Sequence, residues 1–432
     1  MKKEDNKTKD VVKSNKKTNN KKEQDIDNVV VKEVVVEKKV GFNYLEVILI
    51  MVIMLVLGGF LGYFLTNLTK TDAVFKEEVV PTELRQFINT YNDIKENYYE
   101  DINQDELLNA GIKGMIDFLG DKYSVYMSPD ETKSFSEQVD GKYTGIGVEI
   151  QQKDDVVTIS KIFDGTPAKE SGLMVNDQII MVDANDVTGK TTSEIAALIK
   201  NSTNSSVKLK VLRDNKEIEF DINLGSVNIE SVSGEILEKN GKKVAYINIS
   251  IFAANTYQQF LNKLSTLETE GFDSLVIDVR GNTGGYLSTV TDIASLFLEK
   301  GKVIYQLDTK GVVEKEKDKT NTKKDYNVAV LIDKGSASAS EILAAALKES
   351  YDAQVVGTYS YGKGTVQKAY QLDNGATVKY TIQKWLTPKG NWINEVGVEP
   401  TVTVEFDAQT YYDNPSHETD NQLQKALEVL TK

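Results

Sequence analysis

The chain has 432 residues, no cysteine, one histidine and a formal net charge of −14 at pH 7. This length allows several domains with buried cores, and the lack of cysteine excludes disulfides, thiol nucleophiles, iron–sulfur clusters and zinc sites that need sulfur. Because His417 is the only histidine, neither a serine–histidine–aspartate triad nor a multi-histidine metal site is expected. The acidic balance argues against nucleic-acid binding.

Residues 1–45 are rich in lysine and asparagine and indicate a disordered cytoplasmic tail. Residues 46–68 are a predicted transmembrane helix, because positions 47–68 carry no charge and a helix of that length spans about 33 Å. A cleaved signal peptide is the rival interpretation, but its apolar region would be about 7–15 residues long. Lysines on the N-terminal side predict a single-pass protein of the cell membrane, with a cytoplasmic N-terminus and an extracellular body.

Residues 75–140 repeat apolar side chains at helical spacing and indicate a small helical domain. Residues 141–225 then combine short apolar strands with two helical segments, one of them at 192–199. That length and pattern suit one compact α/β unit.

Four motifs in this unit follow one another, at residues 143–148 (Tyr-Thr-Gly-Ile-Gly-Val), 165–168 (Gly-Thr-Pro-Ala), 171–173 (Ser-Gly-Leu) and 177–180 (Asp-Gln-Ile-Ile). Together they resemble a bacterial PDZ domain; the alternative is a glycine hairpin in an ordinary β-domain. The resemblance implies that a peptide's terminal carboxylate binds free backbone N–H groups and that the peptide adds as a strand. The residues of that loop are Gly145, Ile146, Gly147 and Val148.

Residues 226–432 alternate strands with helices, which predicts a layered α/β fold. Two apolar strands, at 274–279 and 328–332, run into small-residue loops at 280–285 and 335–340. Such loops turn sharply and aim N–H groups at one point, as an oxyanion site requires. A phosphate cradle is the rival, but no complete nucleotide-binding glycine motif is present. Taken together, the chain is predicted to be multidomain α/β, with a transmembrane helix, a helical domain, a PDZ domain and a layered α/β core.

A serine nucleophile without histidine needs another base, and lysine serves only when it is neutral. At an ordinary pKa near 10.4, only about one lysine in 2,500 is neutral at pH 7. Burial among small and apolar neighbours lowers that pKa. Lys363 is the candidate, since no acidic residue occurs from position 353 to 371; the alternative is an exposed lysine in a glycine turn.

The chain from about residue 80 to 432 resembles the tail-specific, or C-terminal processing, peptidases, a serine–lysine family with an embedded PDZ domain. The resemblance rests on motifs at 278–285, 335–342, 362–367, 386–390 and 397–400. The residues alone leave three serines of the second small-residue loop open as nucleophile. They are Ser336, Ser338 and Ser340.

The resemblance implies Ser338 as nucleophile, Lys363 as base and Gln367 as a supporting residue. It implies the backbone N–H groups of Gly284 and Ala339 as oxyanion donors. Residues four apart on a straight strand lie about 13 Å apart. We therefore expect a bend near Gly364 that brings Gln367 to Lys363.

The function implied is a membrane-anchored serine endopeptidase, acting on extracytoplasmic proteins and peptides with apolar C-termini. No metal or organic cofactor is implied, and homo-oligomers and an activating partner protein are left open. The main alternative is a catalytically silent or activator-dependent PDZ scaffold that binds protein C-termini. A cell-wall hydrolase is a third interpretation, although Trp385 and Trp392 are expected to pack in the C-terminal sheet rather than to stack on sugars.

Overall fold

The structure is a computed structural model that describes residues 81–432, apart from 155 and 203–204. The predicted tail and transmembrane helix, residues 1–68, lie outside the described residues. Among the residues that are described, no helix is both long and apolar enough to cross a membrane. The chain divides into two units, Met1–Asp93 and Ile94–Lys432, and the second contains the sheets described below.

The helical region begins with α2 (Thr82–Asn97), in which no residue is buried. Helix α3 (Gln104–Asp117) buries only Ile116, so these helices form as predicted but contribute little core. Strand β1 (Val125–Met127) follows, and α4 (Pro129–Asp140) starts at a capping box.

The next part is a β-sheet in the order β3-β4-β5-β7-β8, with β6 paired to β5. Helix α6 confirms the helix predicted at 192–199. The strands enclose their own apolar core, separate from that of the C-terminal part. The elements are β2 (Lys142–Gly145), β3 (Val148–Lys153), β4 (Val156–Ile162), α5 (Pro167–Ser171), β5 (Gln178–Val182), β6 (Asn185–Asp186), α6 (Thr192–Lys200), β7 (Ser206–Arg213), β8 (Lys216–Asn223) and β9 (Gly225–Asn228), which pairs with β2.

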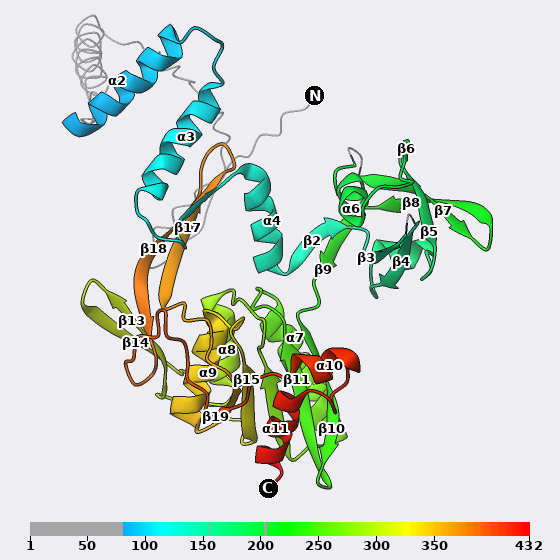
Figure 1. Ribbon diagram of the computed structural model, residues 1–432, viewed down its shortest axis with the longest axis vertical. Coiled ribbons are helices and arrows are strands. Elements are labelled where there is room, and N and C mark those ends of the chain that lie inside the picture. The colour runs from blue at the N-terminus through cyan, green and yellow to red at the C-terminus, as the bar shows by residue number, and fades with distance from the viewer. Residues whose placement is uncertain (1–80, 155, 203–204) are drawn as a thin grey trace, which may run out of the picture. The chain divides into compact units, whose positions relative to one another are not determined.

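The C-terminal part is built on a six-stranded sheet in the order β10-β11-β12-β15-β16-β19, parallel except for the β10–β11 pair. Alternate side chains of its strands feed two cores. Helices α7, α8 and α9 cover one face and α11 the other, as Figure 1 shows. The elements are β10 (Val232–Lys239), β11 (Lys242–Ile249), α7 (Thr256–Glu270), β12 (Ser274–Asp278), α8 (Leu287–Ser295), β15 (Asn327–Ile332), α9 (Ala339–Ala346), a π-helical turn (Leu347–Tyr351), β16 (Gln354–Gly357), β19 (Val402–Thr403), α10 (Ala408–Asp413) and α11 (Asn421–Leu430).

A second sheet of this part has the order β1-β18-β13-β14, with β17 paired to β18 in a long hairpin (Figure 1). Trp385 of β18 is buried as expected. Trp392 is 45% exposed, but it pairs through a β-bridge with Leu386 at the end of β18, and its indole reaches the backbone of the loop before β17. The strands are β13 (Val303–Thr309), β14 (Val312–Lys317), β17 (Thr365–Gln371) and β18 (Thr377–Leu386).

Candidate active site

The three loops that carry the candidate residues leave neighbouring parallel strands. Strand β12 ends at Asp278, β15 at Ile332 and β16 at Gly357, and β15 pairs with both of the others. Because the carboxyl ends of parallel strands meet at one edge of a sheet, the loops that hold Gly284, Ser338 and Lys363 begin side by side.

The structure distinguishes among the three serines of the loop before α9. Ser336 and Ser340 are fully buried, and their hydroxyls donate to the carbonyl oxygens of Val279 and Asn282, each at 2.8 Å. Ser338 is half-buried and caps the N-terminus of α9 at φ 56° and ψ −112°. A serine held in that unusual backbone conformation is typical of a functional turn.

Gly284 lies directly against Ser338. A Cβ at position 284 would be 2.9 Å from Ser338 Cβ and 3.1 Å from the Ala339 nitrogen, so a larger residue has no room there. Within the described residues the Ala339 N–H makes no hydrogen bond, and it points from a helix N-terminus. The Gly284 N–H, by contrast, donates to Asn282 Oδ1 at 2.8 Å. One of the two expected oxyanion donors is therefore available and the other is occupied.

Glu341 joins the serine loop to the lysine loop, and the motif analysis gave it no role. It is fully buried, and its carboxylate accepts four hydrogen bonds. Burial raises the pKa of this carboxyl group, and the hydrogen bonds oppose that rise. The donors are the N–H groups of Ser338 (2.7 Å), Gly362 (2.7 Å) and Lys363 (3.0 Å) and the hydroxyl of Ser360 (2.6 Å).

Two tryptophans hold the backbone at Lys363 and Gly364. Trp385 Nε1 donates to the Lys363 carbonyl at 2.6 Å, and Trp392 Nε1 donates to the Gly364 carbonyl at 2.8 Å. The Lys363 ammonium lies 5.0 Å from the ring centroid of Tyr123. The sequence reasoning missed both indole contacts, because residues 385 and 392 are more than twenty positions from the lysine and no local pattern links them.

The pKa of Lys363 lies below its ordinary value. Burial is the main cause, and the positive charge of Lys379 lowers it further, while Glu341 and Asp121 act in the opposite direction. The expectation that this lysine sits in an environment that favours its neutral form agrees with this direction.

Gln367 makes no hydrogen bond to Lys363 within the described residues. Its Nε2 donates instead to Thr365 Oγ1 at 2.9 Å and to Thr381 Oγ1 at 3.2 Å. The strand irregularity lies between Val366 and Gln367 rather than at Gly364.

In the PDZ-like unit, the loop at 145–148 separates β2 from β3. The carbonyls of Ile146 and Gly147 are hydrogen-bonded, but their N–H groups have no partner within the described residues. Gly147 has φ +84°, and a Cβ there would lie 2.4 Å from Thr166. Strand β3 is an edge strand, which leaves one side free for pairing.

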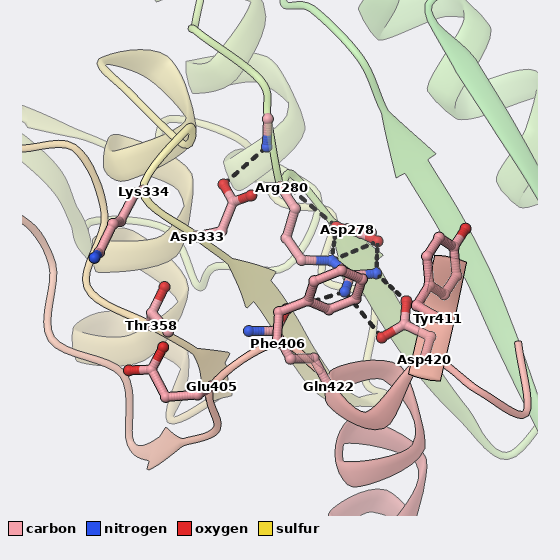
Figure 2. A pocket seen from close by; sticks show the side chains of 11 residues that line it. Asp278, Arg280, Asp333, Lys334, Thr358, Glu405, Phe406, Tyr411, Asp420 and Gln422 are labelled. Carbon is pink, nitrogen blue, oxygen red and sulfur yellow. Dashed lines mark hydrogen bonds and ion pairs between the residues drawn. The ribbon is translucent and has the colours of Figure 1, made fainter. Parts of the chain in front are cut away.

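A cavity of about 490 Å³ lies near the ends of the same core strands, but neither Ser338 nor Lys363 lines it. Figure 2 shows Arg280 at its centre, paired with Asp278 and with Asp420 of the α11 N-terminus. These three side chains neutralise one another and form a structural clamp between β12 and α11. The single histidine, His417, contacts Glu235 and Tyr246 and not the candidate serines.

Comparison with known proteins gives three matches to family models. Peptidase family S41 matches residues 243–404, a PDZ domain matches 144–224, and the activating protease CtpB N-terminal domain matches 64–132.

Similar curated proteins agree with these matches. The carboxy-terminal processing protease CtpB of Bacillus subtilis (strain 168) is 40% identical over 73% of this chain and 66% of its own length. CtpA of the same strain is 37% identical over 73% of this chain and 68% of its own. The "Probable CtpA-like serine protease" of Staphylococcus aureus (strain MRSA252) is 33% identical over 83% and 71%. The alignments thus span about two thirds of these relatives, and the chain belongs to the S41 family of carboxy-terminal processing serine peptidases.

Proposed function

We propose that this chain is a membrane-anchored serine endopeptidase that works outside the cytoplasm on proteins held by their C-terminal tails. Ser338 is the nucleophile, Lys363 the general base, and Gln367 the residue that supports the lysine. The observation that carries the proposal is the buried carboxylate of Glu341, which accepts hydrogen bonds from the backbone of both Ser338 and Lys363.

The chemistry follows from the protonation state of the lysine. Neutral Lys363 takes the proton of the Ser338 hydroxyl as the oxygen attacks a peptide carbonyl, and the ammonium then protonates the leaving amine. Water afterwards attacks the acyl ester, with the lysine again as base. The lowered pKa of Lys363, caused first by burial and then by Lys379, supports this role because it increases the neutral fraction.

The oxyanion that forms in each step needs donors close to Ser338. The Ala339 N–H at the start of α9, which has no partner in the part of the chain that the structure describes, suits this task. One such donor is typically worth about 3–4 kcal/mol. Gly284 is the second proposed donor, and it acts once its N–H leaves Asn282.

Substrate delivery is assigned to the PDZ-like unit. The N–H groups of Ile146 and Gly147, which are free among residues 81–432 as described, suit a terminal carboxylate. The edge of β3 in its sheet suits an added strand. Gly145 and Val148 flank those two residues.

An activator-dependent state of the same enzyme is the second candidate. Two observations favour it: Gln367 makes no hydrogen bond to Lys363 within the described residues, and the Gly284 N–H is donated to Asn282. An activating partner would complete the site by freeing the Gly284 N–H and by bringing Lys363 to the oxygen of Gln367.

The test uses the full chain in detergent with an unfolded protein that ends in apolar residues. We expect cleavage by the unmodified chain, and none above background by Ser338→Ala or Lys363→Ala. Lys334→Ala is the matched control, since Lys334 is an exposed lysine near the serine loop. Cleavage by Ser338→Ala at the unmodified rate would refute the assignment of the nucleophile.

Anchoring and orientation are tested on intact cells. A protease added outside is expected to degrade the body and leave an N-terminal fragment with the membrane. Protection of the body until the cells are lysed would contradict the proposed topology.

A further inference from the structure

The segment between α3 and β1 docks onto the hairpin strand next to Gln367. Asp121 Oδ2 accepts from the hydroxyls of Ser124 at 2.6 Å and Thr381 at 2.5 Å, and Asp121 Oδ1 accepts from the Tyr123 N–H at 3.1 Å. Burial acts to raise the pKa of Asp121, but these hydrogen bonds lower it overall. Asp121 is therefore an ionised carboxylate, which accepts hydrogen bonds and donates none.

This fixes the direction of a chain of hydrogen bonds. The Thr381 hydroxyl has a single hydrogen, and it goes to Asp121 because the carboxylate has none to give. Thr381 Oγ1 is then left to accept from Gln367, so Gln367 must turn its NH₂ group toward Thr381. Its second N–H goes to Thr365 Oγ1, 2.9 Å away.

The carbonyl oxygen of Gln367 is consequently the free end of this amide. Within the described residues no hydrogen bond reaches it. A lysine side chain is a donor in both of its protonation states, so an acceptor is the useful group to present to it. An amide turned the other way would offer N–H groups, which repel an ammonium and compete for the lone pair of a neutral amine.

We propose that Asp121 is a positioning residue for catalysis: through Thr381 it orients the Gln367 amide so that its oxygen, and not its nitrogen, serves Lys363. This rests on the proposed function, which gives Lys363 and Gln367 their roles. The same segment also places the Tyr123 ring 5.0 Å from the Lys363 ammonium. The helical N-terminal region thus takes part in shaping the site of the base.

The variant Asp121→Asn tests the direction of this series of hydrogen bonds. The oxygen of the introduced amide would still accept from the Tyr123 N–H, so the NH₂ group of that amide would face Thr381 and donate to its hydroxyl oxygen. The Thr381 hydroxyl would then donate its own hydrogen to the oxygen of Gln367. The amide of Gln367 then reverses. We expect kcat on the high-pH plateau to fall about tenfold, the effect of about one hydrogen bond, with KM unchanged because no substrate contact is altered. The plateau is compared because loss of the Asp121 charge also lowers the pKa of Lys363.

Two variants of Thr381 separate this from a general loss of structure. Thr381→Ser keeps the hydroxyl and is expected to keep kcat, whereas Thr381→Val removes it and lowers kcat about tenfold. In the Thr381→Val background, Asp121→Asn should cause no further loss of kcat, since the series of hydrogen bonds from Asp121 to Gln367 is already interrupted. The proposal would be overturned if the double variant lost kcat by the product of the two single effects, or if Asp121→Asn alone left kcat unchanged.

The outcome is separable from that of the proposed function. Inactive Ser338→Ala and Lys363→Ala variants beside a fully active Asp121→Asn would refute only the positioning role, whereas an active Ser338→Ala would refute both. A chain that needs an activator is tested by NMR of the Gln367 side-chain amide protons. We expect their signals to shift in Asp121→Asn and Thr381→Val and to stay in place in Thr381→Ser; unshifted signals in Asp121→Asn would overturn the proposal.

Discussion

Glu341 is the residue on which the relative position of the serine loop and the lysine loop most depends, through its buried carboxylate. Its oxygens face only donors: three backbone N–H groups and the Ser360 hydroxyl. Replacing one oxygen by an NH₂ group would set donors against donors and leave buried N–H groups unpaired. Such groups cost about 1–3 kcal/mol each.

Glu341→Gln is therefore expected to lower the free energy of unfolding by about 3 kcal/mol and to reduce kcat more than a hundredfold. Chemical denaturation and peptide hydrolysis measure the two effects. Glu270→Gln, at the exposed end of α7, is the control and should change neither. A Glu341→Gln variant with normal kcat would show that the carboxylate does not hold the loops.

The pH dependence of cleavage also depends on single residues. Lys363 must be neutral to act as base, so the rate should rise with pH and level off above the pKa of Lys363. Lys379 helps to lower that pKa, and burial lowers the pKa of Lys379 itself. Removing its positive charge favours the protonated form of Lys363 and raises the pKa.

Lys379→Met is thus expected to move the rising limb of the pH–rate profile to higher pH, with the plateau unchanged. Lys368→Met, an exposed lysine on β17, is the control and should leave the profile in place. A shift of the limb to lower pH in Lys379→Met would contradict the assignment of Lys363 as the titrating base.

At the scale of elements, what the sequence predicted depends on whether the information is local. The apolar run at 274–279 predicts a buried strand, and the helical segment at 192–199 is likewise recognised locally. The structure has both elements within one or two residues of these bounds. The pairing of β1 with β18 joins segments about 250 residues apart, and no local pattern encodes it. Asp121 was missed for the same reason, because it reaches Gln367 only through that pairing.

The clamp between the core sheet and α11 is an element-level device. Arg280 bridges Asp278, at the end of β12, to Asp420, the N-cap residue of α11, and all three are largely buried (Figure 2). Removing one member of a buried ion pair commonly costs about 3–5 kcal/mol, because the remaining charges are left unpaired.

Arg280→Met is expected to speed hydrogen exchange of the α11 amides by at least a hundredfold, the equivalent of about 2.7 kcal/mol, as the helix opens from the sheet. Lys425→Met removes the more exposed Lys425–Glu428 pair of the same helix. Because surface pairs are worth about 0–1 kcal/mol, this control should exchange almost as the unmodified chain does. Equal protection in Arg280→Met would mean that apolar packing alone holds α11.

At the scale of the whole molecule, the proposed function separates holding a substrate from cutting it. The N–H groups of Ile146 and Gly147, which have no partner within the described residues, lie in the PDZ-like part of the chain, which has its own apolar core. Ser338 belongs to the C-terminal part, which is built on a separate core. Changes in the first should therefore alter KM, and changes in the second kcat. A substrate whose C-terminal carboxylate is capped as an amide loses its charge-assisted hydrogen bonds to the loop.

We expect the capped substrate to show a KM at least about tenfold higher with the same kcat, since a hydrogen bond to a charged group is worth about 1.5–3 kcal/mol.

Gly147→Ala should likewise raise KM for the uncapped substrate, because its Cβ would lie 2.4 Å from Thr166. Gly172→Ala is the matched control: Gly172 has nearly the same φ, +86°, but open space around it, so it carries the backbone strain without the clash. Fluorescence anisotropy with a labelled tail peptide gives the binding directly. Equal binding of capped and uncapped tails would place recognition elsewhere than at this loop, while leaving the assignment of Ser338 and Lys363 intact.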